Sequence, residues 1–338
     1  QQRVFNDTTR WGFEQTRTRL MLRGHVFTPD LQYYVQVDPT RNERIAGRDD
    51  PAANLPTGLY YLEDAWVRYR IAPRWFVRFG QFKLPFNREE LVDPSRQLAV
   101  ERSLVNESLN LGRSQGIELQ WRGETERFDL AIHDGATDDI GGTLRLGLID
   151  PEPRINSNAL SPDAEWAVAA RFESLLAGSW RQFDDFTSPP GDDFGLLVGL
   201  AGHAYKTEST GAPGNVRDEN RWYGATADVS VELGGGSLFG SVIYQYLDTR
   251  PQFELFGVVL QGAAYIHREH ELYLRWEWGQ IDNVAQADLN VLVAGWNWYV
   301  DGHDLKFTAD FGFAESIIDL VWTSTVAGFR RDFRGDEH

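Results

Sequence analysis

The stretch WFVRFGQFKLPFNREELVDPSRQLAVERSLVNESLNLGRSQGIELQW, residues 75–121, reads as a strand, a long polar connection and a second strand. The first arm alternates apolar and polar residues through Val77, Arg78 and Phe79, and residues 117–121 do the same in the second arm. Alternation is the period of an extended strand whose two faces differ chemically. Roughly 30 residues without a strand pattern lie between the arms, and a connection of that length in a compact fold is usually functional or disordered. The stretch therefore predicts two strands joined by a long loop that folds inward into the lumen of a pore.

The composition of the 338 residues excludes several function classes. A formal charge of −17 repels nucleic-acid backbones, so no nucleic acid is expected as a partner. The chain has no cysteine and seven scattered histidines, which argues against thiol catalysis, disulfide scaffolding and zinc fingers. No linker divides the sequence, and closed β-barrels commonly reach this length as one unit. A single domain over residues 1–338 is expected.

The basic residues are almost all arginine, because only Lys83, Lys206 and Lys306 are lysines among the 33 basic residues. Arginine presents a planar, permanently charged fork of donors, which suits close contact with anions or carboxylates. A compositional bias of the organism would also explain the excess, so both interpretations stay open.

Aromatic residues make up 13% of the chain, yet no apolar run approaches the roughly 20 residues that a membrane-spanning helix requires. Strands of a membrane barrel need only about 10 residues each and carry their apolar side chains at alternate positions. A polar average composition is therefore compatible with a chain that crosses a membrane as a barrel.

The alternating pattern recurs along the whole chain. About fourteen strands are expected, over residues 16–26, 31–38, 62–71, 75–83, 115–122, 128–134, 165–173, 194–205, 222–233, 238–247, 257–266, 272–281, 289–300 and 305–313. Residues 174–192 form the one irregular connection. A bulge at Gly80 is expected, because it would keep Arg78, Gln81 and Lys83 on one face.

Short turns and long loops alternate between these strands for most of the chain. Soluble sandwiches have no reason to show this alternation, whereas an outer-membrane barrel has short periplasmic turns at one rim and long external loops at the other. Aromatic residues near strand ends are candidates for the interfacial girdles, with core packing as the alternative: Trp66, Trp75, Trp121, Trp166, Trp222, Tyr246, Trp276, Trp278, Trp296, Trp298 and Tyr299. The pattern predicts an all-β, antiparallel transmembrane barrel in the outer membrane of a diderm bacterium.

The segments GQFKLPFNREEL (80–91), ERSLVNE (101–107), LEDAWVRYR (62–70) and RTRLMLRGHVFTPDLQYYVQVD (17–38) resemble the phosphate-selective porin O and P family of outer-membrane channels. The resemblance extends from about residue 16 to 135, with a weaker echo in residues 296–311. It implies a 16-stranded barrel, usually trimeric, whose third external loop folds inward to narrow the pore.

The resemblance also fixes the register of the strands. If residues 84–112 are the third loop, residues 16–26 are strand two and residues 305–313 are strand fifteen. The first and last strands are then missing, so we expect either that the chain is a portion of a longer polypeptide or that its end strands are not resolved.

Assigning the apolar face of each strand to lipid places its partner face in the lumen. The candidate pore-lining and constriction residues are Arg17, Arg19, Arg23, Arg68, Arg70, Arg78, Lys83, Arg88, Glu89, Glu90, Glu101, Arg102, Glu107, Glu118 and Arg122. Other charged candidates on the lumen faces include Asp64, Arg171, Asp228, Arg275, Glu277 and Lys306. A basic wall opposite an acidic loop would create a transverse field at the narrowest point.

Two interpretations of these arginines stay open. They form a track for anions such as phosphate, whose oxygens match the guanidinium fork, or they are neutralised by carboxylates and hold the loop in place. The phosphate sites of the family depend on several lysines, and only Lys83 lies in a matching motif here.

The sequence predicts a porin for passive diffusion of small hydrophilic solutes or ions, with anions such as phosphate among the candidates. The alternative is a structural envelope barrel that acts as an anchor or assembly partner with an incidental pore. No enzymatic site, cofactor or metal is expected, although His267 and His270 lie three residues apart and the acidic residues in 138–153 and 184–193 would suit calcium. The expected partners are outer-membrane lipid and lipopolysaccharide, two further copies in a homotrimer, and other envelope proteins.

Overall fold

The computed structural model describes residues 17–38, 61–135, 164–207, 221–248, 252–282 and 288–315. Within these residues a single antiparallel sheet contains fourteen strands, each paired with its neighbours in the sequence. The strands are β1 (Leu20–Val26), β2 (Thr28–Asp38), β3 (Tyr61–Ala72), β4 (Trp75–Lys83), β5 (Arg113–Arg122), β6 (Glu126–His133), β7 (Ala164–Ala177), β8 (Gly195–Thr207), β9 (Arg221–Glu232), β10 (Gly236–Asp248), β11 (Phe253–His267), β12 (His270–Ile281), β13 (Leu289–Asp301) and β14 (Leu305–Glu315). The predicted set of about fourteen strands is confirmed.

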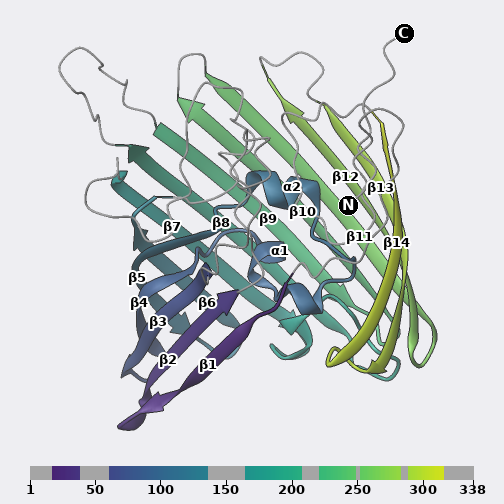
Figure 1. The fold of residues 1–338 in the computed structure, drawn as a ribbon, viewed down its shortest axis with the longest axis horizontal. Coiled ribbons are helices and arrows are strands. Elements are labelled where there is room, and N and C mark those ends of the chain that lie inside the picture. The colour runs from purple at the N-terminus through teal and green to yellow at the C-terminus, as the bar shows by residue number, and fades with distance from the viewer. Residues whose placement is uncertain are drawn as a thin grey trace, which may run out of the picture.

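The sheet curves around an interior in which the short helices α1 (Arg88–Leu91) and α2 (Leu104–Leu109) lie, as Figure 1 shows. In the part of the chain that the structure describes, β1 pairs only with β2 and β14 only with β13, so the sheet is not closed there. The all-β barrel fold with an inward-folded loop is confirmed. The expectation that two end strands lie outside the chain stays a prediction.

Alternation along each strand separates an outer apolar face from an inner face. On β12, Leu272, Leu274 and Trp276 are exposed on the outside, whereas Glu271 and Arg275 are buried on the inside. The two-residue period of the strand produces this division directly.

None of the described residues belongs to a helix that is both long and apolar enough to cross a membrane.

The inner face is not polar everywhere. On β10 to β13 it carries buried aliphatic side chains such as Leu255, Val259 and Val291, which belong to one apolar cluster with Val105 and Leu109 of α2. The assignment of apolar faces to lipid is therefore wrong as a general rule on these strands. The inner face of these strands carries polar and charged side chains as well as apolar ones, and the apolar ones pack against the loop between β4 and β5.

The connections follow the predicted alternation, with short turns such as residues 73–74, 123–125 and 268–269 at one rim. Residues 178–194, between β7 and β8, are the long exception and contain the 3₁₀ helix η3 (Gln182–Asp184). The strand before them reaches Ala177, so its predicted end at residue 173 was too early.

The predicted bulge at Gly80 is absent, because the pairing of β3 with β4 passes through Trp66 and Gly80 without a register shift. Gly80 instead adopts a φ of 121°, and a Cβ there would lie 2.1 Å from the carbonyl oxygen of Ala65. The irregularity lies at Glu63, where the β2–β3 register shifts and Gln36 pairs with Asp64. This shift brings Glu63 to the inner face, where it is buried.

The aromatic girdle prediction holds for Trp75, Trp166 and Trp298, which are exposed on the outer face. It is wrong for Trp66, which stacks on Tyr34 at a ring distance of 5.4 Å on the inner side. It is also wrong for Trp222, which is buried in the apolar cluster beside Tyr205. These two tryptophans occupy inward positions of their strands, where packing rather than a membrane interface accounts for them.

Candidate functional site

The candidate site is built around residues 84–112, the inner loop, which leaves the end of β4 and returns to the start of β5. Its base is closed by the amide of Leu84, which donates to the carbonyl of Gly112 at 3.0 Å. The loop contains α1, the 3₁₀ helix η2 (Pro94–Arg96) and α2. Ser103 caps the N-terminus of α2 by accepting from the amide of Asn106 at 2.9 Å. The loop lies across the concave side of the sheet (Figure 1).

Side chains of distant strands hold the inner loop by its main-chain groups. Arg171 on β7 donates to the carbonyl of Phe86 at 2.8 Å, and Arg275 on β12 donates to that of Glu101 at 2.8 Å. The same kind of contact is made by Gln245 to Leu109 O (2.9 Å), Lys306 to Gln97 O (2.5 Å), Glu277 from Leu104 N (2.6 Å) and Asp310 from Val100 N (3.0 Å). The loop is thus attached to strands from β7 to β14.

Carboxylates neutralise the two buried arginines that hold the loop. Arg171 makes two hydrogen bonds to Asp228, at 2.8 and 2.9 Å, and one to Glu173 at 3.0 Å. Arg275 pairs with Glu277 at 2.8 Å. A buried charge is tolerated only when it is paired in this way, so these arginines are structural anchors rather than free cations.

Inside the loop, Glu89 joins α1 to α2. Its carboxylate accepts from the amide and the hydroxyl of Ser103, both at 2.6 Å, and is fully buried. Asn87 donates to the side chain of Asn106 at 2.6 Å, parallel to this link. The two helices are therefore fixed relative to each other by buried hydrogen bonds.

A second group of charges lies at the base of the loop, around Glu90. Arg102 pairs with Glu90 at 3.0 Å and with Glu107 at 3.9 Å, and the ammonium of Lys83 lies 3.5 Å from Glu90. Burial alone would raise the pKa of Glu90, but Arg102 and Lys83 lower it to about 2. Burial raises the pKa of Glu107 to about 7, with Arg102 opposing the rise and Glu90 adding to it.

The wall opposite the loop, formed by β1 to β5 and the residues just before β1, carries several ion pairs. Most of its arginines have a carboxylate within 4.0 Å: Arg17–Glu101 (2.5 Å), Arg19–Glu63 (2.7 Å), Arg78–Glu118 (2.7 Å), Arg113–Asp64 (3.0 Å) and Arg122–Asp129 (2.6 Å). The first of these pairs joins the wall to the loop. The wall therefore carries charges of both signs.

Arg68 differs from the other arginines of this wall. Within the described part of the chain no carboxylate lies within 4.0 Å of its guanidinium, which donates to the amide oxygens of Gln32 at 2.6 Å and Gln120 at 3.4 Å. The group lies over the ring of Phe76 at 4.9 Å. Arg78 is its direct cross-strand neighbour, so positive charge is concentrated at this point of β3 and β4.

The remaining predicted residues lie apart from this group. Arg23 is exposed on β1, and Arg70 pairs with Asp30 close to the short-turn rim. Arg88 points to the opposite side of the interior, where it donates to the hydroxyl of Ser230 at 2.9 Å and to the carbonyl of Phe183 at 2.6 Å. The structure thus brings together most, but not all, of the candidate residues.

Two charged residues of the site, Glu63 and Arg113, were not among the candidates. Strand parity places Glu63 with Ala65 and Arg113 with Ile117 on the outer face, so alternation points away from both. The register shift of β2–β3 turns Glu63 inward. At the end of β5, Arg113 reaches inward to pair with Asp64. No local signal in the sequence marks either position.

Among the described residues, no group of three or more His, Cys, Asp or Glu side chains is placed to hold a metal ion. The rings of His267 and His270 lie 5.8 Å apart at a turn, and His270 stacks on Trp296 instead. The calcium candidates in 138–153 lie outside the described residues. The fixed charges of the wall and of the inner loop create an electrostatic field across the space between them.

Residues 4–145 match the family model of the phosphate-selective porins O and P, so the predicted resemblance is confirmed over this part of the chain. An uncharacterized protein of Aquifex aeolicus is 25% identical over 264 residues, which cover 72% of this chain and 60% of the relative. The chain therefore spans less than two thirds of the length of this curated relative.

Two solved structures share the fold. An anion-selective porin from Comamonas acidovorans superimposes with a TM-score of 0.51 at 13% identity, over 83% of this chain and 74% of that one. The trimer form of OmpT, an outer membrane protein of Vibrio cholerae, gives a TM-score of 0.52 at 11% identity, over 94% and 87% of the two chains. The chain thus has the fold of these outer-membrane β-barrels.

Proposed function

We propose that this outer-membrane barrel is a porin for the passive diffusion of small hydrophilic solutes, with a weak preference for anions over cations. The observation that carries the proposal is the inner loop, which lies across the concave side of the sheet and faces a wall of fixed charges. Narrowing of this kind limits solute size, and the charges beside it set a preference for one sign.

The pairing of the arginines supports a weak preference rather than a strong one. Arg17, Arg19 and Arg78 each have a carboxylate within 3 Å, so most of the positive charge on the wall is balanced. Arg68 donates to two side-chain amides and leaves an excess of positive charge on the wall. A guanidinium with uncharged partners can still attract a passing anion.

Strong selectivity for phosphate is not part of the proposal. Lys83, the lysine of the matching motif, donates to the carbonyl of Glu90 at 2.5 Å and lies 3.5 Å from its carboxylate. A cation held in this way by a buried acid has little attraction left for a solute anion.

We further propose that the protein assembles as a homotrimer in the membrane. The trimer form of a solved barrel with the same fold supports this assembly. Unheated electrophoresis in mild detergent, followed by cross-linking, should give a species of three chains that heating converts to one. A single-chain species in both experiments would show the assembly to be wrong.

The test of the function is the reversal potential of the purified protein in a planar bilayer under a salt gradient. We expect conductance from the wild type and a reversal potential that indicates a modest anion preference. The variant Arg68→Gln should shift this potential toward cation preference, whereas Arg74→Gln, which removes the same charge at an exposed turn, should leave it unchanged. A barrel without conductance would instead favour the anchor role, and an unchanged potential in Arg68→Gln would remove Arg68 from the selectivity.

A further inference from the structure

Residues 178–194, here called the rim segment, connect β7 to β8 at the rim where the other described connections are short turns. A turn of this length would be expected to extend away from the barrel into water. Instead its central side chains are buried, with Phe183 and Phe186 each 4% exposed and Ser188 fully covered. The rim segment therefore folds back into the interior.

Inner-face groups of several strands bind the rim segment. The hydroxyl of Ser237 on β10 donates to the carbonyl of Phe186 at 2.7 Å, and the hydroxyl of Thr187 donates to Glu271 on β12 at 2.7 Å. The amide of Gly235, in the β9–β10 turn, donates to the carbonyl of Ser188 at 2.9 Å. These contacts hold the rim segment against the inner side of β10 and β12.

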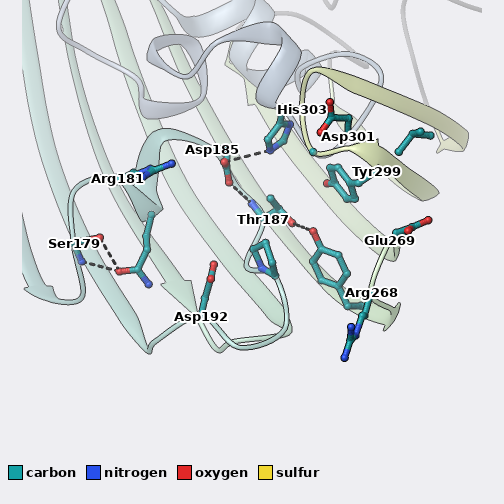
Figure 2. A pocket seen from close by; sticks show the side chains of 15 residues that line it. Ser179, Arg181, Asp185, Thr187, Asp192, Arg268, Glu269, Tyr299, Asp301 and His303 are labelled. Atoms are coloured by element: carbon teal, nitrogen blue, oxygen red, sulfur yellow. Dashed lines mark hydrogen bonds and ion pairs between the residues drawn. The ribbon is translucent and has the colours of Figure 1, made fainter.

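At its far side the rim segment reaches the turn between β13 and β14. There Asp185 lies 3.2 Å from the imidazole of His303. Thr187 lies 3.0 Å from the hydroxyl of Tyr265 on β11. Figure 2 shows Asp185 facing His303. The segment, this turn and the stacked rings of Tyr265 and Tyr299 together line a pocket of about 590 Å³. The rim segment thus extends along the short-turn rim from β7 to the turn after β13.

The rim segment also contacts the inner loop, which enters from the opposite rim. Arg88 of α1 donates to the carbonyl of Phe183 at 2.6 Å and lies over the rings of Phe183 and Phe186, at 5.7 and 5.4 Å. Arg96 of η2 adds a more exposed pair with Asp184 at 3.8 Å. Two segments from opposite ends of the barrel meet on the side of β7 to β12.

The exposure of the arginines differs between the two sides of the interior. Side chains on and just before the early strands keep contact with water, with Arg17 before β1 27% and Arg78 on β4 17% exposed in their ion pairs. On the later strands Arg171 is 1% and Arg275 is 7% exposed. Water therefore reaches the wall of β1 to β5 more readily than the wall of β7 to β12.

We infer that the rim segment is a second constriction of the channel, which together with the inner loop closes the side of β7 to β12 and confines solutes to the wall of β1 to β5. The inference rests on the proposed porin function. It assigns the limiting cross-section to two segments, joined by Arg88, instead of to the inner loop alone.

The first test replaces residues 181–192 by a short Gly-Ser turn in the full chain and measures single-channel conductance. If the rim segment blocks part of the lumen, conductance should rise by roughly two-fold, because ion flow follows the open cross-section. Unchanged conductance in a variant that still migrates as a folded barrel before heating would overturn the inference. The wild-type channel, measured first, tests the porin function separately.

The second test keeps the length of the chain and separates a constriction from a folding defect. Arg88→Met removes the bond to Phe183 and should increase conductance part of the way toward the replaced-turn variant. Arg181→Met removes an exposed arginine of the rim segment and should leave conductance at the wild-type value. If both methionine variants conduct as the wild type does, Arg88 does not hold a second constriction and the inference is wrong.

Discussion

Glu107, on α2 of the inner loop, carries a carboxyl group whose pKa lies near neutral pH. Burial raises the pKa of Glu107 to about 7. Arg102 opposes this rise, and the negative charges of Glu90 and Glu101 add to it. With that pKa, the carboxyl group is about one tenth neutral at pH 8 and about nine tenths neutral at pH 6. The loop therefore loses about 0.8 of a negative charge over this range.

We predict that the anion preference of the channel increases as the pH falls from 8 to 6, because removing a negative charge beside the path favours anions. The reversal potential in a fixed salt gradient, measured at several pH values, follows the change. Glu107→Gln should show the higher anion preference already at pH 8 and should lose most of the pH dependence.

Glu124→Gln is the matched control for this prediction. It removes the same charge at an exposed turn, where Glu124 pairs with Arg74 and is 83% exposed. It should keep the pH dependence of the wild type. If Glu107→Gln retains the full pH dependence, the titrating group lies elsewhere and the role given to Glu107 is wrong.

At the level of elements, the position of α2 depends on a glycine in the barrel wall. A Cβ at Gly257 on β11 would lie 2.5 Å from Val105 and 2.8 Å from Leu109. Val105 is β-branched and buried, so it cannot turn aside at low cost. The helix therefore approaches the wall as closely as it does because this position has no side chain.

We predict that Gly257→Ala destabilises the folded barrel by about 1–3 kcal/mol, the usual cost of overpacking a filled core, and changes the single-channel conductance because α2 must shift. Urea unfolding followed by tryptophan fluorescence measures the first effect. Adding Val105→Ala to this variant should recover part of both effects.

Gly312→Ala provides the comparison, because a Cβ there would meet Val293 at an ordinary 3.6 Å. It should leave stability and conductance close to the wild type. Equal effects of the two alanine variants would mean that backbone freedom, rather than contact with α2, requires glycine in the wall.

Most strands could be predicted from the sequence because alternation is a local property of each segment. The inner loop could be placed from its length and from the resemblance of its motifs. The apolar inner faces of β10 to β13 could not, because Leu255 and Val259 are covered by α2, which is more than a hundred residues away in the chain. Glu63 was missed for a related reason, since its direction depends on how β2 pairs with β3.

For the whole molecule, the outer face forms an apolar surface whose cost of substitution should depend on depth. Leu260 lies in the middle of β11 and is 50% exposed, whereas Ile266 lies near its end and is 64% exposed. Both side chains point outward. The two positions differ in their distance from the middle of the strand.

We predict that Leu260→Arg destabilises the barrel in lipid vesicles by about 2–4 kcal/mol and Ile266→Arg by about 0–1 kcal/mol, because a charge is costly at the bilayer midplane and tolerated at the interface. Reversible unfolding in urea from vesicles would measure the difference. A similar cost at both positions would mean that β11 does not cross the bilayer in the expected direction.

The attachment of the inner loop through its peptide groups separates two properties of the channel. Arg171, Arg275 and Gln245 bind carbonyl oxygens, which every amino acid supplies. The path of the loop therefore depends little on which side chains it carries toward the water-filled side. Substitutions of charged side chains such as Glu101 can therefore change which solute the channel favours, while the main-chain contacts that hold the loop stay the same.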